Sequence, residues 1–420
     1  MLGAGSSSDR RLGACAAHLM SGITAASSSG RQLPQEPLVV LLLGGPAQFG
    51  DVPLTEAVAR AVPSGAVEVI DGRLAFGLDD YLAGGWPDVK QVRNAAVAGG
   101  LSSQTATAQV GTAAPADREA LLASADVVLA GFPYPLDLVA RAKKLRWVHS
   151  LNAGASNFRQ PFAGATVDLW GSDVALTTAR GANGSLPIAE YVLASILMWG
   201  KSLPQGFADA AQGAFAPRTS YAPQLIAGKT VGVIGLGGIG CQVARLCSAV
   251  GMRVVATRRS TLGPNESMPE GVAELLQPKA LPSLLAQADF VVVCTQWTPE
   301  SENLLSTSEF AMMKCGAVLV NVARGEIVDS AALVAALESG HVAAAALDVY
   351  AGEFDGLPPE ALWKRDNVLI TPHVSSSVEV EVASQHAQGM EVFLANLQAF
   401  VAGGGATEAL KNVVDWQRGY

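Results

Sequence analysis

Short apolar segments alternate with amphipathic or polar ones along most of the chain after residue 37. Residues 38–44 read LVVLLLG, which is the length of one strand. Residues 117–131 read as a helix followed by a strand, and residues 136–154 repeat that order. Strands that alternate with helices are typical of βαβ units, so the pattern predicts a parallel sheet flanked by helices.

A second alternating series runs from residue 229 to residue 373. Between the two series, residues 186–201 form a long apolar segment, which predicts a helix that links two domains. We find no internal repeat of the kind that builds a solenoid. The chain has 420 residues, 50% of them hydrophobic, which is enough for two α/β domains with separate cores.

Two segments depart from this pattern. Residues 1–35 are rich in Ser, Ala and Gly and carry three arginines against the single acid Asp9. This composition is typical of an organelle transit peptide, so we expect residues 1–36 to be one, directed to a chloroplast rather than a mitochondrion. The alternative is an ordinary disordered tail on a cytoplasmic protein. Residues 94–116 are of low complexity and predict a surface insertion.

The composition argues against several kinds of partner. The net charge is −9, whereas a nucleic-acid-binding protein usually presents a basic face. No apolar run approaches the roughly 20 residues that span a bilayer, so we expect neither a nucleic-acid nor a membrane partner. The five cysteines form no C-x-x-C pair and no cluster with histidine, which favours a reducing compartment and no metal site.

The most informative stretch is a glycine-rich turn between a predicted strand and a predicted helix. Gly235 would permit the tight turn, Gly237 would let the backbone approach a pyrophosphate, and Gly240 would let the helix pack closely on the strand. The start of the helix then offers N–H groups to the phosphates. This strand–turn–helix context favours a dinucleotide site over a turn without a ligand. The residues expected to bind the cofactor here are Gly235, Gly237, Gly238, Ile239 and Gly240.

Three polar residues follow successive predicted strands of the second series. Arg324 follows VLVNVA, Glu353 follows AALDVYAG, and His373 follows NVLITP. Loops at the carboxyl ends of parallel strands are where open α/β sheets bind their ligands. Each residue alone has a structural alternative, as a surface arginine, a solvated turn residue or an interdomain histidine. Together they favour a site that binds a small carboxylate and works by acid–base chemistry.

With these motifs the sequence resembles the D-isomer-specific 2-hydroxyacid dehydrogenase family. The resemblance covers roughly residues 37–402 and rests on GKTVGVIGLGGIG, MMKCGAVLVNVARGEIVD, AALDVYAGE and NVLITPHVS, in family order and spacing. It implies two Rossmann-like, doubly wound parallel-sheet domains with the active site in the cleft between them. The substrate domain would comprise residues 37–190 and 374–420, and the NAD(P)-binding domain would comprise residues 191–373.

The resemblance implies that Arg324 anchors the substrate and that His373 is the general acid/base, with Glu353 as its carboxylate partner. The implied reaction is hydride transfer from NAD(P)H to C2 of a 2-oxo acid, while His373 protonates the developing alkoxide. An unperturbed imidazole titrates near ~6.5, so a neighbouring carboxylate helps to keep it protonated. The fixed fork of donors on an arginine suits a carboxylate substrate.

The resemblance implies further contacts. In LNAGASN, the backbone N–H groups around Ala153 and Gly154 would hold the substrate carboxylate. Thr298, Ala323 and Asp348 would contact the cofactor, with Asp348 near the nicotinamide carboxamide. Members of the family usually form homodimers, so we expect a homodimer here.

The strand after the glycine-rich helix ends in Arg258 and Arg259. NAD-using members of the family end this strand in an aspartate, which accepts from the ribose 2′-OH. An arginine cannot accept a hydrogen bond, but Arg258 and Arg259 can clamp a phosphate ester. The alternative is that both arginines are solvated at the strand end. We therefore expect a preference for NADP(H), with NAD(H) as the alternative cofactor.

The resemblance implies a small 2-oxo acid substrate, of the glyoxylate or hydroxypyruvate type, reduced to the D-2-hydroxy acid. Glu353 argues against a formate dehydrogenase, because those members carry glutamine there. Phe354 and Gln296 stand where the family usually has proline, which leaves the substrate open. Two alternatives remain: a corepressor-like relative that senses the nucleotide without turnover, and an adenosylhomocysteine-hydrolase-like enzyme, against which Arg258 argues.

Overall fold

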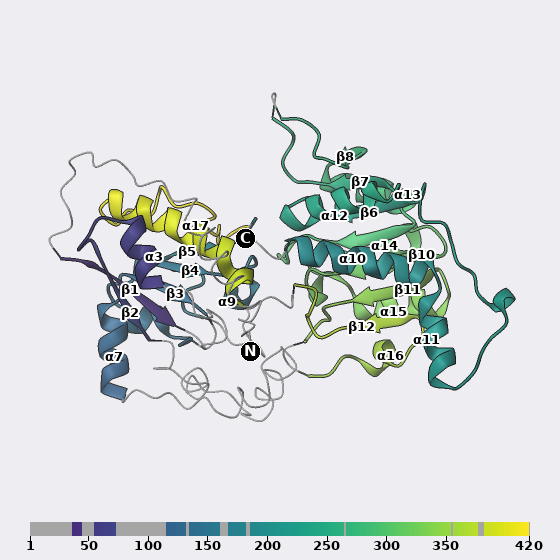
Figure 1. Cartoon of the computed structure of the whole chain (residues 1–420), viewed down its shortest axis with the longest axis horizontal. Helices are drawn as coiled ribbons and strands as arrows, with labels where there is room; N and C mark the ends of the chain where they lie inside the picture. Colours follow the sequence, from purple (N-terminus) through teal and green to yellow (C-terminus); the bar gives the residue numbers. More distant parts are fainter. Residues whose placement is uncertain are drawn as a thin grey trace, which may run out of the picture. The chain divides into compact units, whose positions relative to one another are not determined.

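The structure is a computed structural model of the chain (Figure 1). It describes residues 36–43, 54–72, 115–131, 134–159, 167–181, 185–263, 266–353, 356–376 and 382–419. These residues fall into two compact units. The first unit takes the described residues up to 181 and from 382 onward, and the second takes residues 185–376 with their two gaps.

The described residues of the first unit form a five-stranded parallel sheet in the order β2-β1-β3-β4-β5. Strand β3 reads VVLA and is buried along its whole length, as expected for a parallel sheet that is covered on both faces. The elements of this unit are β1 (Leu38–Leu43), α3 (Leu54–Ala61), β2 (Val67–Asp71), α7 (Pro115–Ser124), β3 (Val127–Ala130), α8 (Leu138–Arg141), β4 (Trp147–Ser150), α9 (Ser156–Arg159), β5 (Ala175–Thr178) and α17 (Val382–Ala402).

The last helix of the chain packs beside an early one in this unit. Helix α17, yellow in Figure 1, lies against the purple helix α3. The indole ring of Trp147 in β4 lies 5.4 Å from the ring of Phe393 and 5.5 Å from the ring of Phe400, both in α17. Leu54 of α3 belongs to the same core. This shared core explains why segments from both ends of the sequence form one unit.

The described residues of the second unit form a seven-stranded parallel sheet in the order β12-β11-β10-β9-β6-β7-β8. In chain order, this sheet starts with β6, gains β7 and β8 on one side of β6, and then gains β9, β10, β11 and β12 on the other side. The winding therefore reverses between β6 and β9, which is the kind of point where open α/β sheets bind ligands.

The elements of the second unit are α10 (Ser185–Gly200), α11 (Leu203–Ala211), η1 (Arg218–Ser220), β6 (Thr230–Ile234), α12 (Gly238–Ala249), β7 (Arg253–Thr257), β8 (Glu274–Leu276), η2 (Pro278–Ala280), α13 (Leu281–Gln287), β9 (Phe290–Val293), α14 (Thr307–Met312), β10 (Ala317–Asn321), η3 (Gly325–Ile327), α15 (Ser330–Glu338), β11 (Val342–Leu347), α16 (Glu360–Trp363) and β12 (Val368–Ile370).

The α/β class and the two parallel sheets are confirmed. The expected linking helix is α10, which lies wholly in the second unit, so the boundary falls before residue 185 rather than at residue 190. Helix α10 belongs there because its buried residues Ala189, Val192 and Ile196 share a core with α12 (Figure 1). The second boundary likewise falls after residue 377 rather than after residue 373.

Several expectations concern residues outside this description. The predicted transit peptide and the predicted insertion fall, apart from their last residues, outside the described ranges, and so does Phe354. Within those ranges, none of the helices has both the length and the apolar character needed to cross a bilayer.

Candidate active site

The residues predicted to bind ligands in the second unit all follow strands of its sheet. Because the described strands pair in parallel, their carboxyl ends meet at one edge, and the loops after them lie at that edge. The residues that follow β6, β7, β9, β10, β11 and β12 are, in that order, Gly235, Arg258, Thr298, Arg324, Glu353 and His373.

The turn after β6 has the tight geometry of a phosphate-binding loop. Gly235 has a φ of +97°, in the left-handed region, and a Cβ there would lie 2.7 Å from the Cα of Thr295. A Cβ on Gly240 would collide with the carbonyl oxygen of Gly235, so α12 can approach the strand this closely only with glycine at that position. A Cβ on Gly237 would meet nothing within 4 Å, so this side of the turn faces open space.

Helix α12 starts at this open side. Its first residues are Gly238 and Ile239, and the N–H groups of a helix's first turn have no partner within the helix. The aligned peptide dipoles also give this end partial positive charge. The turn and the helix start therefore fit the pyrophosphate of a dinucleotide.

Arg324 lies in a turn that the side chain of Asn321 holds. Asn321 Nδ2 donates to the carbonyl oxygen of Arg324 at 3.0 Å, and Asn321 Oδ1 accepts from the Ala323 N–H at 3.0 Å. The guanidinium of Arg324 donates to the carbonyl oxygen of Ala323 at 2.6 Å. Asn321 is 1% exposed and was not among the predicted site residues, although a polar side chain at the end of an apolar strand could have indicated a structural role there.

The neighbouring Gly325 brings this turn against the loop that follows β11. A Cβ on Gly325 would collide with the backbone of Tyr350 and with the nitrogen of Ala351. The two backbones therefore touch directly, and the contact leaves room only for glycine. Since Glu353 lies in the same loop, this contact sets how near the Arg324 turn comes to Glu353.

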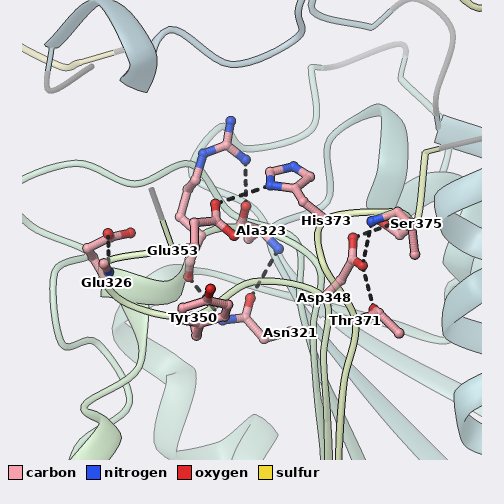
Figure 2. A network of polar contacts seen from close by, with 12 residues as sticks. Asn321, Ala323, Glu326, Asp348, Tyr350, Glu353, Thr371, His373 and Ser375 are labelled. Atoms are coloured by element: carbon pink, nitrogen blue, oxygen red, sulfur yellow. Dashed lines mark hydrogen bonds and ion pairs between the residues drawn. The ribbon is translucent and has the colours of Figure 1, made fainter. Parts of the chain in front are cut away.

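Glu353 and His373 form a hydrogen-bonded pair (Figure 2). Glu353 Oε1 lies 3.1 Å from His373 Nδ1, and the exposed fractions of the two side chains are 7% for Glu353 and 32% for His373. Because a carboxylate can only accept, Nδ1 carries the proton in this pair. That arrangement fixes the ring tautomer and makes Nε2 the nitrogen that can exchange a proton.

The buried carboxylate of Asp348 holds the turn that carries His373. Asp348 Oδ1 accepts from the Thr371 hydroxyl at 2.6 Å and from the Val374 N–H at 2.8 Å, and Oδ2 accepts from the Ser375 N–H at 2.9 Å (Figure 2). His373 has a φ of +54°, which is uncommon for a residue with a Cβ. The structure thus gives Asp348 a positioning role, and its contact with the nicotinamide carboxamide stays a prediction.

The Asp348 network continues into α10. The Tyr191 hydroxyl lies 2.7 Å from the hydroxyl of Thr371, which itself donates to Asp348. Burial raises the pKa of Tyr191 to about 12, so its hydroxyl keeps its proton and donates to Thr371. The turn around His373 is therefore tied to both a strand end and a helix.

Glu326 adds a second carboxyl group near the pair. Burial raises the pKa of Glu326, the nearby Glu353 carboxylate raises it further, and Arg324 opposes the shift. Glu326 Oε1 accepts from the Gly352 N–H at 3.4 Å (Figure 2). Glu326 is thus coupled electrostatically to both Arg324 and Glu353.

Arg258 makes two contacts at the end of β7. Its Nη1 forms an ion pair with Glu266 Oε1 at 2.6 Å, and its Nε donates to the Ser260 hydroxyl at 2.7 Å. The preceding residue, Thr257, accepts from the Gly235 N–H through its hydroxyl at 3.2 Å. The end of β7 is therefore joined to the glycine-rich turn.

The remaining predicted residues lie as follows. Arg259 is exposed beside Arg258, while Thr298 and Ala323 are buried after β9 and β10. Ala153 and Gly154 follow β4 in the first unit, so their part in holding a substrate carboxylate stays a prediction. Among the residues that the structure describes, no cluster of three or more His, Cys, Asp or Glu side chains could hold a metal ion.

Comparison with known proteins supports the interpretation of the second unit as a dinucleotide-binding domain. Residues 193–375 match the family model for the NAD-binding domain of D-isomer specific 2-hydroxyacid dehydrogenases. The crystal structure of a D-isomer specific 2-hydroxyacid dehydrogenase from Xanthobacter autotrophicus Py2, in complex with NADPH and MES, is 26% identical with a TM-score of 0.63. The similarity covers 92% of this chain and 100% of that chain. Residues 193–375 of this chain therefore form the NAD-binding domain of the D-isomer-specific 2-hydroxyacid dehydrogenase family.

Two relatives of this chain are named for different reactions. The D-3-phosphoglycerate dehydrogenase of Archaeoglobus fulgidus is 37% identical over 206 residues, which are 49% of this chain and 37% of that protein. The glyoxylate reductase of Thermococcus gammatolerans is 40% identical over 151 residues, which are 36% of this chain and 43% of that protein. The chain spans less than half the length of each, so these similarities leave the substrate open.

We expect Gly325→Ala to destabilise the second unit, because the new methyl group would be forced into the backbone of Tyr350. Urea unfolding should show a loss of about 1–3 kcal/mol, as for other overpacked sites. Gly356→Ala is the matched control, since a Cβ there meets nothing within 4 Å. Equal unfolding free energies for the two variants would show that the contact at Gly325 does not matter.

Proposed function

We propose that this protein is an NAD(P)H-dependent reductase that converts a small 2-oxo acid into the D-2-hydroxy acid. The observation that carries the proposal is the common sheet edge, where the Glu353–His373 pair, the Arg324 turn and the glycine-rich turn all follow strands of one sheet. An acid/base, an anion-binding arginine and a dinucleotide site are the parts that this reaction needs.

The glycine-rich turn supports a nicotinamide dinucleotide as the cofactor. The open side at Gly237 and the first-turn N–H groups of α12, from Gly238 and Ile239, would receive its pyrophosphate. When bound, the reduced cofactor supplies a hydride to C2 of the substrate.

His373 would supply the proton. With Nδ1 donating to Glu353, Nε2 is the nitrogen that carries the proton to the substrate oxygen. The Glu353 carboxylate stabilises the imidazolium before the transfer and keeps the ring in one orientation afterwards. General acid catalysis of this kind is typically worth about 10²–10⁴-fold in rate.

Arg324 would bind the substrate carboxylate and polarise its carbonyl group. A guanidinium presents paired N–H donors that match a carboxylate, and an ammonium does not. Asn321 and Gly325 fix the backbone on both sides of Arg324, so the guanidinium extends from a rigid base.

We favour glyoxylate or hydroxypyruvate as the substrate, with D-3-phosphoglycerate as the alternative. The Thermococcus relative is named a glyoxylate reductase and the Archaeoglobus relative a D-3-phosphoglycerate dehydrogenase, at similar identities. Purified protein would be given NADPH or NADH with glyoxylate, hydroxypyruvate or pyruvate, and the loss of reduced-cofactor absorbance followed. D-3-phosphoglycerate with the oxidised cofactors would be tested in parallel, and no turnover in either direction would contradict the proposal.

We further propose that NADP(H) is the preferred cofactor. Arg258 stands where an aspartate would contact the ribose of NAD(H), and it lies at the end of β7 beside the glycine-rich turn. The related Xanthobacter protein was crystallised with NADPH. NADP(H) carries a 2′-phosphate that NAD(H) lacks, and a guanidinium can bind this phosphate through charge-assisted hydrogen bonds.

We expect His373→Gln to lose most turnover while retaining cofactor binding, because glutamine keeps a polar side chain but cannot transfer a proton. The measurements are kcat for the preferred 2-oxo acid and the Kd of the reduced cofactor by fluorescence. A variant that turns over at near the wild-type rate would disprove the assignment of His373 as the acid.

We expect Arg324→Lys to raise KM and lower kcat together. Lysine keeps the charge but loses the paired donors that would hold the substrate in both ground and transition states. Steady-state kinetics with the preferred 2-oxo acid measure both constants. An unchanged kcat/KM would mean that Arg324 does not touch the substrate.

We expect Arg258→Asp to reverse the cofactor preference. The loss of one charge-assisted contact should weaken NADPH binding about 10- to 150-fold, and the new carboxylate can accept from the ribose of NADH. The measurement is kcat/KM for both cofactors in wild type and variant. If kcat/KM of the wild-type protein is the same for NADH and NADPH, Arg258 does not select the cofactor.

A further inference from the structure

The ion pair of Arg258 with Glu266 puts an acid where the 2′-phosphate of NADP(H) is expected to bind. We propose that Glu266 is a specificity-determining residue, whose carboxylate occupies the Arg258 guanidinium and competes with the 2′-phosphate for it. The inference rests on the proposed NADP(H) site. It adds a residue that sets how strongly that site distinguishes the two cofactors.

Both partners of the ion pair are held in place. Glu266 uses Oε1 for Arg258 at 2.6 Å, and its Oε2 accepts from the Gly263 N–H at 3.2 Å. The Glu266 N–H also donates to the carbonyl oxygen of Gly263 at 3.0 Å. On the other side, Ser260 accepts from Arg258 Nε at 2.7 Å. The guanidinium is therefore already engaged by polar groups of this protein before any cofactor binds.

The position of Arg258 relative to the glycine-rich turn supports competition at the cofactor site. The carbonyl oxygen of Thr257 accepts from the Leu236 N–H at 2.8 Å, which anchors the backbone next to Arg258. Burial raises the pKa of the Cys241 thiol, and the charge of Arg258 opposes that shift. Because Cys241 lies in the first turn of α12, the guanidinium is near enough to act on the helix start that would bind phosphates.

The ion pair is also accessible to a ligand. The Arg258 side chain is 26% exposed and the Glu266 side chain 43% exposed. The hydrogen bond from Arg258 lowers the pKa of Glu266, so Glu266 remains a carboxylate at neutral pH. A 2′-phosphate carries more negative charge than a carboxylate and can displace it, but it must first break the existing pair and it is repelled by Glu266.

The experiment uses the full-length protein and two probes that differ only in the 2′-phosphate, adenosine 2′,5′-bisphosphate and 5′-AMP. Calorimetric titration at fixed ionic strength gives a Kd for each. Glu266→Gln should bind the bisphosphate about two- to fivefold more tightly, within the range expected for an exposed ion pair. Its affinity for 5′-AMP should stay unchanged.

Two further variants separate direct competition from a general charge effect. Glu270→Gln removes one negative charge from an exposed position in the same segment, and it should not tighten binding of the bisphosphate to the same extent. In an Arg258→Gln background, the substitution of Glu266 should have no additional effect, because the shared partner is gone.

Each outcome decides a different point. The competition is overturned if Glu270→Gln tightens bisphosphate binding as much as Glu266→Gln does. It is also overturned if Glu266→Gln leaves the bisphosphate Kd unchanged while Arg258→Gln weakens binding. In both cases the proposed NADP(H) site still stands. An unchanged Kd in Arg258→Gln overturns that site and this inference together. Since neither probe carries a nicotinamide or turns over, the result does not depend on the proposed reductase activity.

Discussion

The carboxylate of Asp348 joins the end of β11 to the turn after β12, and the site depends on that connection. It accepts three hydrogen bonds from residues on either side of His373. A buried charge that loses its partners costs several kcal/mol, so the Asp348 carboxylate keeps its hydrogen bonds only while the turn is formed, and it stabilises that turn. His373 sits within that turn at a φ of +54°, so the place of the imidazole is set by Asp348 and not by His373 itself.

Close backbone contacts give the rest of the site its precision. Gly240 lets α12 start against the carbonyl of Gly235, and Gly325 lets the Arg324 turn touch the backbone of Tyr350. At Gly240 a methyl group would push α12 away from the turn after β6, and at Gly325 it would push apart the loops that follow β10 and β11. A carboxylate, an arginine and a phosphate-binding turn on separate loops can act together only if their backbones are fixed to within a fraction of an ångström.

The sequence predicted which residues reach the sheet edge, because parallel strands put all their carboxyl ends there. Arg324, Glu353 and His373 follow from that rule alone. The sequence did not predict which polar groups form hydrogen bonds with one another, such as the three hydrogen bonds to Asp348. Loop conformations leave no periodic pattern in the sequence from which such pairs could be recognised. Glu266 lies eight positions after Arg258, and the described residues between them belong to no helix or strand, so nothing in the sequence pairs them.

Both arginines proposed to bind anions lie beside glutamates of this protein. Arg258 pairs with Glu266, and Arg324 interacts electrostatically with Glu326. A guanidinium with an internal counter-ion is stable before the ligand binds, but the ligand must then compete with that counter-ion. A 2′-phosphate can do so through its greater charge. A substrate carboxylate has no such advantage, but burial raises the pKa of Glu326, so the carboxyl group near Arg324 takes up a proton more readily than an exposed glutamate does.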